Sequence, residues 1–169
     1  MSVEIDARPY DHPDVTRMVD AVQAEYVVMY GGPDAAMIDP GEFVPPAGLL
    51  LVGSLDGSAV AMAGWRRLSP RVAEVKRMYV DPRVRGRGLS RVMLESAERS
   101  ALEAGVEEFV LNTAPLQRAA IALYESSGYV PGTPFGHYAD NSGALFYAKR
   151  LRADNEARSP QRTGLVDER

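Results

Sequence analysis

Residues 79–98 read YVDPRVRGRGLSRVMLESAE, an apolar segment that passes through arginines and glycines into an amphipathic pattern. The apolar residues after Gly88 recur at helical spacing, and the segment before the arginines has the composition of a strand. A helix N-terminus carries about four unpaired backbone N–H groups and about half a positive charge, so it attracts anions. Gly86 and Gly88 leave the backbone open to close approach. This junction between a strand and a helix therefore predicts a binding site for a diphosphate. The alternative is a surface turn with solvated arginines, namely Arg83, Arg85, Arg87 and Arg91.

The composition excludes several classes of protein. The chain has 169 residues, of which 46% are hydrophobic and 25% charged, as in one globular domain of ordinary size. A net charge of −4 gives no overall attraction to nucleic acid or to an anionic membrane. The absence of cysteine excludes disulfides and thiolate chemistry and agrees with a reducing compartment. No signal peptide or apolar span is recognisable. We expect a cytoplasmic protein with a single domain over residues 1–151 and a polar, flexible tail over 152–169.

The order of apolar segments predicts an α/β fold with a mixed sheet and helices packed against it. Expected strands cover residues 3–8, 49–55, 58–68, 72–80, 106–113, 129–132 and 143–151. Expected helices cover about 13–30, with Asp11 as N-cap, then 89–104, then a segment from about Thr113–Pro115 to Gly128. The Gly- and Pro-rich loop 31–48 is long enough to be functional or mobile.

In the expected strand 72–80, strict alternation places Val75, Arg77 and Tyr79 on one side. The other side then holds Glu74, Lys76, Met78 and Val80, unless a bulge resets the alternation.

The arginine–glycine loop does not have the pattern of common nucleotide sites. Neither G-x-x-x-x-G-K-S/T nor G-x-G-x-x-G after a first strand is present. Instead, Arg85–Ser90 (RGRGLS) resembles the acyl-CoA pyrophosphate loop of the GNAT superfamily of N-acetyltransferases, whose signature is Q/R-x-x-G-x-G/A. The last position departs from that signature, since Ser90 replaces Gly or Ala. The resemblance extends over residues 74–151 and includes AIALYESSGY at 120–129.

This resemblance implies a GNAT-like fold of six to seven strands splayed centrally, with about four helices. It implies acetyl-CoA as co-substrate, no metal, and direct attack by a primary amine of a small molecule or exposed peptide. A homodimer is common in the family. The pantetheine is expected to pair with the backbone of Met78, Tyr79 and Val80, and the pyrophosphate to take N–H groups from the loop. The implied cofactor residues are thus Met78, Tyr79, Val80, Arg85, Gly86, Arg87, Gly88, Leu89, Ser90 and Arg91, with Gln117 as an amide contact or, alternatively, a surface residue.

Two residues match the family's proton-transfer positions. Tyr124 is expected to protonate the departing sulfur, because a phenol with a pKa near 10 and a thiol near 8.5 are closely matched. Glu74 is expected to act as general base, often through water, because an alkyl ammonium with a pKa near 10.4 must lose its proton. The alternatives are a core tyrosine for Tyr124 and an ion pair with Arg66 or Arg67 for Glu74.

The acceptor pocket is expected to be aromatic, since the first helix, the loop 31–48 and the last hairpin converge in this fold. Its candidates are Tyr26, Tyr30, Trp65, Phe135 and His137, accompanied by Phe43 and Tyr138. The loop acids Asp34, Asp39, Glu42 and Asp140 are candidates for binding a cationic acceptor. A second hypothesis is a non-catalytic acyl-CoA-binding or regulatory module on the same fold. A nucleic-acid binder is disfavoured by the acidic net charge, and two isolated histidines do not make a metal site.

Overall fold

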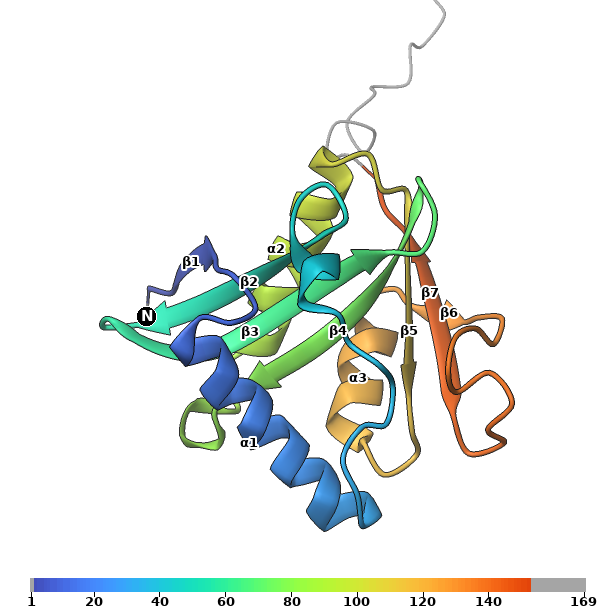
Figure 1. Ribbon diagram of the computed structural model, residues 1–169, viewed down its shortest axis with the longest axis horizontal. Helices are drawn as coiled ribbons and strands as arrows, with labels where there is room; N and C mark the ends of the chain where they lie inside the picture. Colours follow the sequence, from blue (N-terminus) through green and yellow to red (C-terminus); the bar gives the residue numbers. More distant parts are fainter. Residues whose placement is uncertain (1, 153–169) are drawn as a thin grey trace, which may run out of the picture.

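The computed structural model describes residues 2–152, so most of the expected tail lies outside the described residues. One mixed sheet of seven strands runs in the order β1-β2-β3-β4-β5-β7-β6 (Figure 1). The strands are β1 (Glu4–Ala7), β2 (Gly48–Leu55), β3 (Ser58–Arg67), β4 (Val72–Val80), β5 (Glu108–Thr113), β6 (Val130–Pro131) and β7 (Leu145–Arg150). No described helix is both long enough and apolar enough to cross a membrane.

The described residues form three α-helices, where about four helices were expected. They are α1 (Pro13–Tyr30), α2 (Leu89–Glu103) and α3 (Arg118–Ser126), with two 3₁₀ turns, η1 (Pro40–Phe43) and η2 (Pro82–Val84). The N-cap of α1 is His12, whose Nδ1 accepts from Asp14 N at 3.1 Å; the prediction of Asp11 was wrong by one position. The third helix also begins later than expected, after Gln117.

The helices cover both faces of the sheet. On one face α1 buries Val15 and Met18 against β2 and β3 residues such as Leu50. On the other face α2 buries a stripe that includes Met93 and Ala97, and α3 adds Tyr124, Leu123 and Ala120. Figure 1 shows α1 in front of the sheet and α2 behind it. The predicted amphipathic patterns therefore correspond to two separate apolar cores.

The sheet forks between its two central parallel strands. β4 and β5 pair only where residues 72–74 lie beside residues 108–110. Beyond this point β4 stays paired with β3, and β5 stays paired with β7. Figure 1 shows the two strands diverging, with α3 beside the opening. The far half of β4 thus has an edge that no strand of the described chain covers.

A bulge in β4 changes which side chains share a face. Met62 pairs with Tyr79 and Gly64 with Lys76, so two residues of β4 lie opposite one residue of β3. Arg77 has a φ of 59°, a left-handed conformation that non-glycine residues rarely adopt. The extra residue places Lys76 and Arg77 on the same face, where both reach Asp34.

The bulge also corrects the strict alternation expected for this strand. Met78 and Val80 pack in the same apolar core as Val75. Tyr79 lies in the opposite core, beneath α1. The backbone of residues 78–80 therefore continues along the fork with its side chains anchored on both sides.

Candidate active site

The opening of the sheet leads into a cavity of about 620 Å³. Its walls come from the end of α1, the loop that follows, β4, β5, the start of α3 and the loop before β7. The lining residues include Tyr26, Tyr30, Asp34, Val75, Lys76, Arg77, Met78, Asn112, Thr113, Gln117, Tyr124, Tyr138 and Asn141. A cavity of this size accommodates a small molecule or the end of a larger one.

A second hollow of about 480 Å³ lies at the arginine–glycine loop. It brings together most of the predicted pyrophosphate residues, with α3 as the facing wall: Val80, Arg85, Gly86, Gly88, Leu89, Ser90, Arg91, Ala119, Ala122, Leu123 and Ser126. The first cavity and the second hollow share β4 and α3 as walls, because different residues of these two elements line each of them. An elongated ligand can therefore lie along β4 and occupy both.

The loop has the backbone conformation of an anion site. Gly86 and Gly88 both have a φ of 79°, and a Cβ built on either would meet open space. Gly88 caps α2 without a side-chain hydrogen bond. Within residues 2–152, the amides of Gly88, Leu89 and Ser90 donate no hydrogen bond. Unpaired amides at the positive end of a 15-residue helix attract a phosphate.

The surrounding arginines differ in how far their charges are compensated. Arg83 is paired with Asp81 at 2.7 Å, so it contributes little to the loop. Arg85 donates to the Val80 carbonyl and to Glu25. Among the described residues, Arg91 donates to the hydroxyls of Ser126 in α3 and of Ser127, the C-cap of that helix, which keeps its charge available beside the second hollow.

Tyr124 lies on the wall of the first cavity and is only 6% exposed. Its ring packs edge-to-face against Tyr129, with centroids 5.5 Å apart. Burial, aided by the nearby Tyr26, raises the pKa of the Tyr124 phenol above its ordinary value. Tyr124 is therefore a neutral hydroxyl that can donate a proton at any physiological pH.

Tyr26 faces the same cavity from α1. Burial raises the pKa of Tyr26 to about 12, although the positive charge of Arg77 opposes the shift. The cavity thus has protonated phenols from elements on both faces of the sheet.

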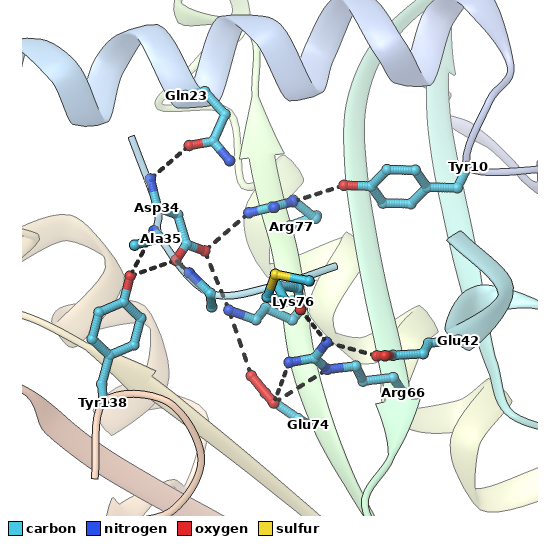
Figure 2. A network of polar contacts seen from close by, with 12 residues as sticks. Tyr10, Gln23, Asp34, Ala35, Glu42, Arg66, Glu74, Lys76, Arg77 and Tyr138 are labelled. Atoms are coloured by element: carbon cyan, nitrogen blue, oxygen red, sulfur yellow. Dashed lines mark hydrogen bonds and ion pairs between the residues drawn. The ribbon is translucent and has the colours of Figure 1, made fainter. Parts of the chain in front are cut away.

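A buried network of charges continues from the cavity wall into the protein (Figure 2). Asp34 Oδ2 accepts from Lys76 Nζ at 3.3 Å and from Arg77 Nη1 at 3.2 Å. Asp34 Oδ1 accepts from the Tyr138 hydroxyl at 2.6 Å, and Arg77 Nε donates to the Tyr10 hydroxyl at 3.0 Å. These contacts fix the loop after α1 and the loop before β7 to the bulge of β4.

Asp34 remains ionised in this setting. Burial alone raises the pKa of its carboxyl, but Lys76, the Tyr138 hydroxyl, the Ala36 amide and Arg77 more than offset it. The resulting pKa is about 2. Asp34 is therefore a weak base and a permanent negative charge.

Glu74 lies in the inner part of the network and does not line the cavity. Its Oε2 accepts from Arg66 Nη2 at 3.2 Å, and its Oε1 lies 3.6 Å from Lys76 Nζ. Arg66 in turn donates to Glu42 at 2.6 Å. The ion pair considered as the alternative for Glu74 is therefore present, and its carboxylate has no direct approach to the cavity.

The structure corrects part of the expected acceptor pocket. Trp65 is 2% exposed in the core beneath α2, where its Nε1 donates to Ser100 Oγ at 3.0 Å. Trp65 lies on the face of β3 opposite α1. The prediction of an aromatic pocket did not take into account which face of the sheet its side chain occupies. Phe135 packs on Phe146, and His137 is exposed; neither lines the cavity.

Some cavity residues were not singled out from the sequence as site residues. Lys76 and Arg77 are the main ones, and their signal was two adjacent basic residues within a strand whose other charged residue is Glu74. Thr113, which the sequence offers as a weaker candidate at the end of a strand bordering the opening, lines the cavity too, with a buried hydroxyl that has no hydrogen-bond partner among the described residues. Within the same part of the chain, no group of three or more His, Asp or Glu residues could hold a metal ion.

Comparison with known proteins agrees with this geometry. The sequence model of the Acetyltransferase (GNAT) family matches residues 15–129. An IAA acetyltransferase of Azospirillum brasilense is 41% identical over 78 residues, which are 46% of this chain and 51% of that protein. The human N-acetylaspartate synthetase is 31% identical over 119 residues, 70% of this chain and 39% of that protein. The chain thus spans about half or less of the length of these curated relatives.

Solved structures share the fold over nearly the whole described chain. A protein assigned as an acyl-CoA N-acyltransferase from Klebsiella pneumoniae superposes with a TM-score of 0.76 and 25% identity, covering 89% of this chain and 98% of its own. A GNAT acetyltransferase from Elizabethkingia anophelis with acetyl-CoA bound gives a TM-score of 0.65 at 12% identity, covering 88% and 98%. The second likeness shows the fold alone.

Proposed function

This chain belongs to the GNAT acetyltransferase family, and on that premise we propose that it transfers the acetyl group of acetyl-CoA to a primary amine. We assign the activity to a single domain over residues 1–151. The observation that carries the proposal is the forked sheet, whose opening connects the cavity beside Tyr124 with the hollow at Gly86 and Gly88. The names of the relatives support the acetyl transfer.

The residues on the wall fit acetyl-CoA. The uncovered edge of β4 offers the backbone of residues 78–80 to the pantetheine as an added strand would. The unpaired amides of Gly88, Leu89 and Ser90 suit the pyrophosphate, with Arg91 beside it. Gln117 lines the first cavity, and its side-chain amide can donate or accept a hydrogen bond there. When bound, acetyl-CoA supplies the thioester that the amine attacks.

Tyr124 serves as the acid in this proposal. The amine nitrogen forms a bond to the acetyl carbon, the carbon–sulfur bond breaks, and the sulfur receives the Tyr124 proton. The buried phenol is well suited, since its raised pKa keeps it protonated. Tyr124 then recovers a proton from water in the cavity.

The amine loses its proton to water before or during attack, without a dedicated carboxylate base. Glu74, expected as that base, is paired with Arg66 behind the cavity wall. Asp34 does line the cavity, but its pKa of about 2 makes it a weak base. We therefore assign Glu74 to holding Arg66 and Lys76 in place.

A thiol-release assay with acetyl-CoA tests the proposal, using a panel of primary amines that includes amino acids, alkyl amines, polyamines and short peptides. Acetyl transfer to at least one class of amine is expected. Calorimetric binding of coenzyme A without transfer to any amine would instead favour the non-catalytic acyl-CoA-binding module. Absence of both binding and transfer would refute both functions.

A further inference from the structure

The charges that face the cavity are not balanced. Within residues 2–152, the lining residues that are charged at neutral pH are Asp34, Lys76 and Arg77, so two cations and one anion face the cavity, while Glu74, which also pairs with Lys76, lies behind its wall. All three side chains are nearly buried, with exposures of 11%, 9% and 5%. A ligand in the cavity therefore meets mainly positive groups, although Glu74 offsets part of that charge from behind the wall. The cavity is thus better suited to a ligand that carries a negative charge.

The two cations also have donors to spare. Lys76 and Arg77 share a single oxygen of Asp34, at 3.3 and 3.2 Å (Figure 2). The other carboxylate near Lys76, that of Glu74, is 3.6 Å away and receives its hydrogen bonds from Arg66. Arg77 Nη2 donates no hydrogen bond to any described residue. An ammonium has three donors and a guanidinium five, so both can bind a second carboxylate.

We infer that Lys76 and Arg77 bind a carboxylate of the acceptor, so that the substrate is a small amine that also carries a carboxylate. The inference rests on the proposed acetyl transfer and specifies its acceptor. The carboxylate balances the charges that face the cavity, and its position directs the amine along the cavity towards Tyr124. A polyamine is disfavoured, because it brings further positive charge beside Lys76 and Arg77.

Matched acceptors test the inference directly. Glycine, β-alanine and L-aspartate are each compared with their own carboxamides in the thiol-release assay, since the amide keeps the size but loses the charge. Rates are expressed per neutral amine, because the amine of the carboxamide has the lower pKa. For at least one pair, kcat/KM is expected to be about tenfold or more higher for the acid, the size of a lost charge-assisted hydrogen bond. Equal or better turnover of every amide would overturn the inference while leaving the proposed function intact.

Substitutions of Lys76 separate a role in carboxylate binding from a role in folding. Lys76→Met is expected to remove the preference for the acid mainly by raising KM, and Lys76→Arg to retain it. Lys149→Met is the control, because Lys149 is also a partly buried lysine in an ion pair, with Glu98 at 2.7 Å, and does not line the cavity. An unchanged preference in Lys76→Met, or an equal loss in Lys149→Met, would overturn the inference.

Binding of the same three acids to the protein saturated with coenzyme A is then measured by calorimetry. Binding that depends on Lys76, without turnover of any amine, would support the carboxylate site and refute the proposed acetyl transfer. Absence of both binding and turnover of the acids would overturn the inference, while turnover of another amine of the panel would keep the proposed function.

Discussion

The Tyr138 hydroxyl donates a hydrogen bond to Asp34 Oδ1 at 2.6 Å, which joins two loops 104 positions apart in the chain. Tyr138 belongs to the loop before β7, and Asp34 to the loop after α1. Because Lys76 and Arg77 of the β4 bulge also bind Asp34, one carboxylate connects three segments around the cavity. The acceptor side of the site is therefore assembled by tertiary contacts.

Replacing Asp34 by Asn is expected to lower the free energy of unfolding at pH 7. The pKa of Asp34 is about 2 in the folded protein, against an ordinary value of 3.8. This difference corresponds to about 2 kcal/mol of stability. Because the folded-state pKa is depressed, this contribution is present above pH 3.8 and is lost as the pH falls towards 2.

Urea unfolding of wild type and Asp34→Asn at several pH values between 3 and 7 measures this effect. The difference between the two proteins should shrink at the acid end. Asp20→Asn, at an exposed position of α1, is the control and should change stability by less than about 0.5 kcal/mol. A difference that is the same at pH 3 and pH 7 contradicts the assignment of Asp34 as the ionised partner.

Tyr124→Phe is expected to lower kcat by about 100-fold, the effect of losing a general acid, while the Kd for coenzyme A changes little. Because burial raises the pKa of Tyr124, the acid form is lost only above pH 10. Wild-type kcat should therefore not decline between pH 8 and 9.5 through ionisation of this residue. Tyr147→Phe is the control, since its hydroxyl donates to Glu125 away from the cavity. Normal turnover in Tyr124→Phe would exclude it as the acid.

Gly88→Ala is expected to weaken binding of coenzyme A by about tenfold or more and to destabilise the fold by about 1–2 kcal/mol. The destabilisation follows from its φ of 79°, which a side chain disfavours. Gly57→Ala is a close control, because Gly57 has a φ of 80° and a Cβ there also meets open space, but in the β2–β3 turn. Gly57→Ala should lose similar stability and keep its Kd. Equal changes of Kd in both variants would show that strain alone, and not phosphate contact, is responsible.

Local sequence patterns were sufficient to predict the elements whose conformation depends on residues close in the sequence. The span of β4 and the start of α2 were predicted correctly, since they depend on apolar periodicity and on the helix N-terminus after Gly88. The same holds for the glycine-rich loop, whose positive φ angles only glycine adopts at low cost.

The residues on the acceptor side of the cavity were harder to predict, because contacts between distant segments determine their positions. The bulge places a non-glycine residue, Arg77, in a left-handed conformation, and no local signal in VKRMY requires it. Asp34 was one of four candidate loop acids, and only the folded structure distinguishes the one that reaches β4. Trp65 was misplaced because its face of β3 is set by packing against α2. Long-range contacts decide these positions, so single-residue patterns do not reveal them.

Glu74→Gln distinguishes a positioning role from a catalytic base. Glu74 is 4% exposed and paired with Arg66, so its loss leaves Arg66 with Glu42 alone and should destabilise the protein by about 1.5–3 kcal/mol. A general base would in addition contribute about 100-fold or more to kcat. We expect kcat at saturating acceptor to fall by less than about tenfold under conditions where the variant is folded.

The control for this variant is Glu98→Gln, which breaks a similar pair with Lys149, 2.7 Å apart and remote from the cavity. If Glu74 only positions its neighbours, both variants lose stability in urea unfolding, and both retain the slope of log kcat against pH. A loss of 100-fold or more in Glu74→Gln alone, with a changed pH profile, would restore Glu74 as the base acting through water. The reason is direct: removing a proton acceptor alters the pH dependence of turnover, whereas removing a structural partner of Arg66 does not.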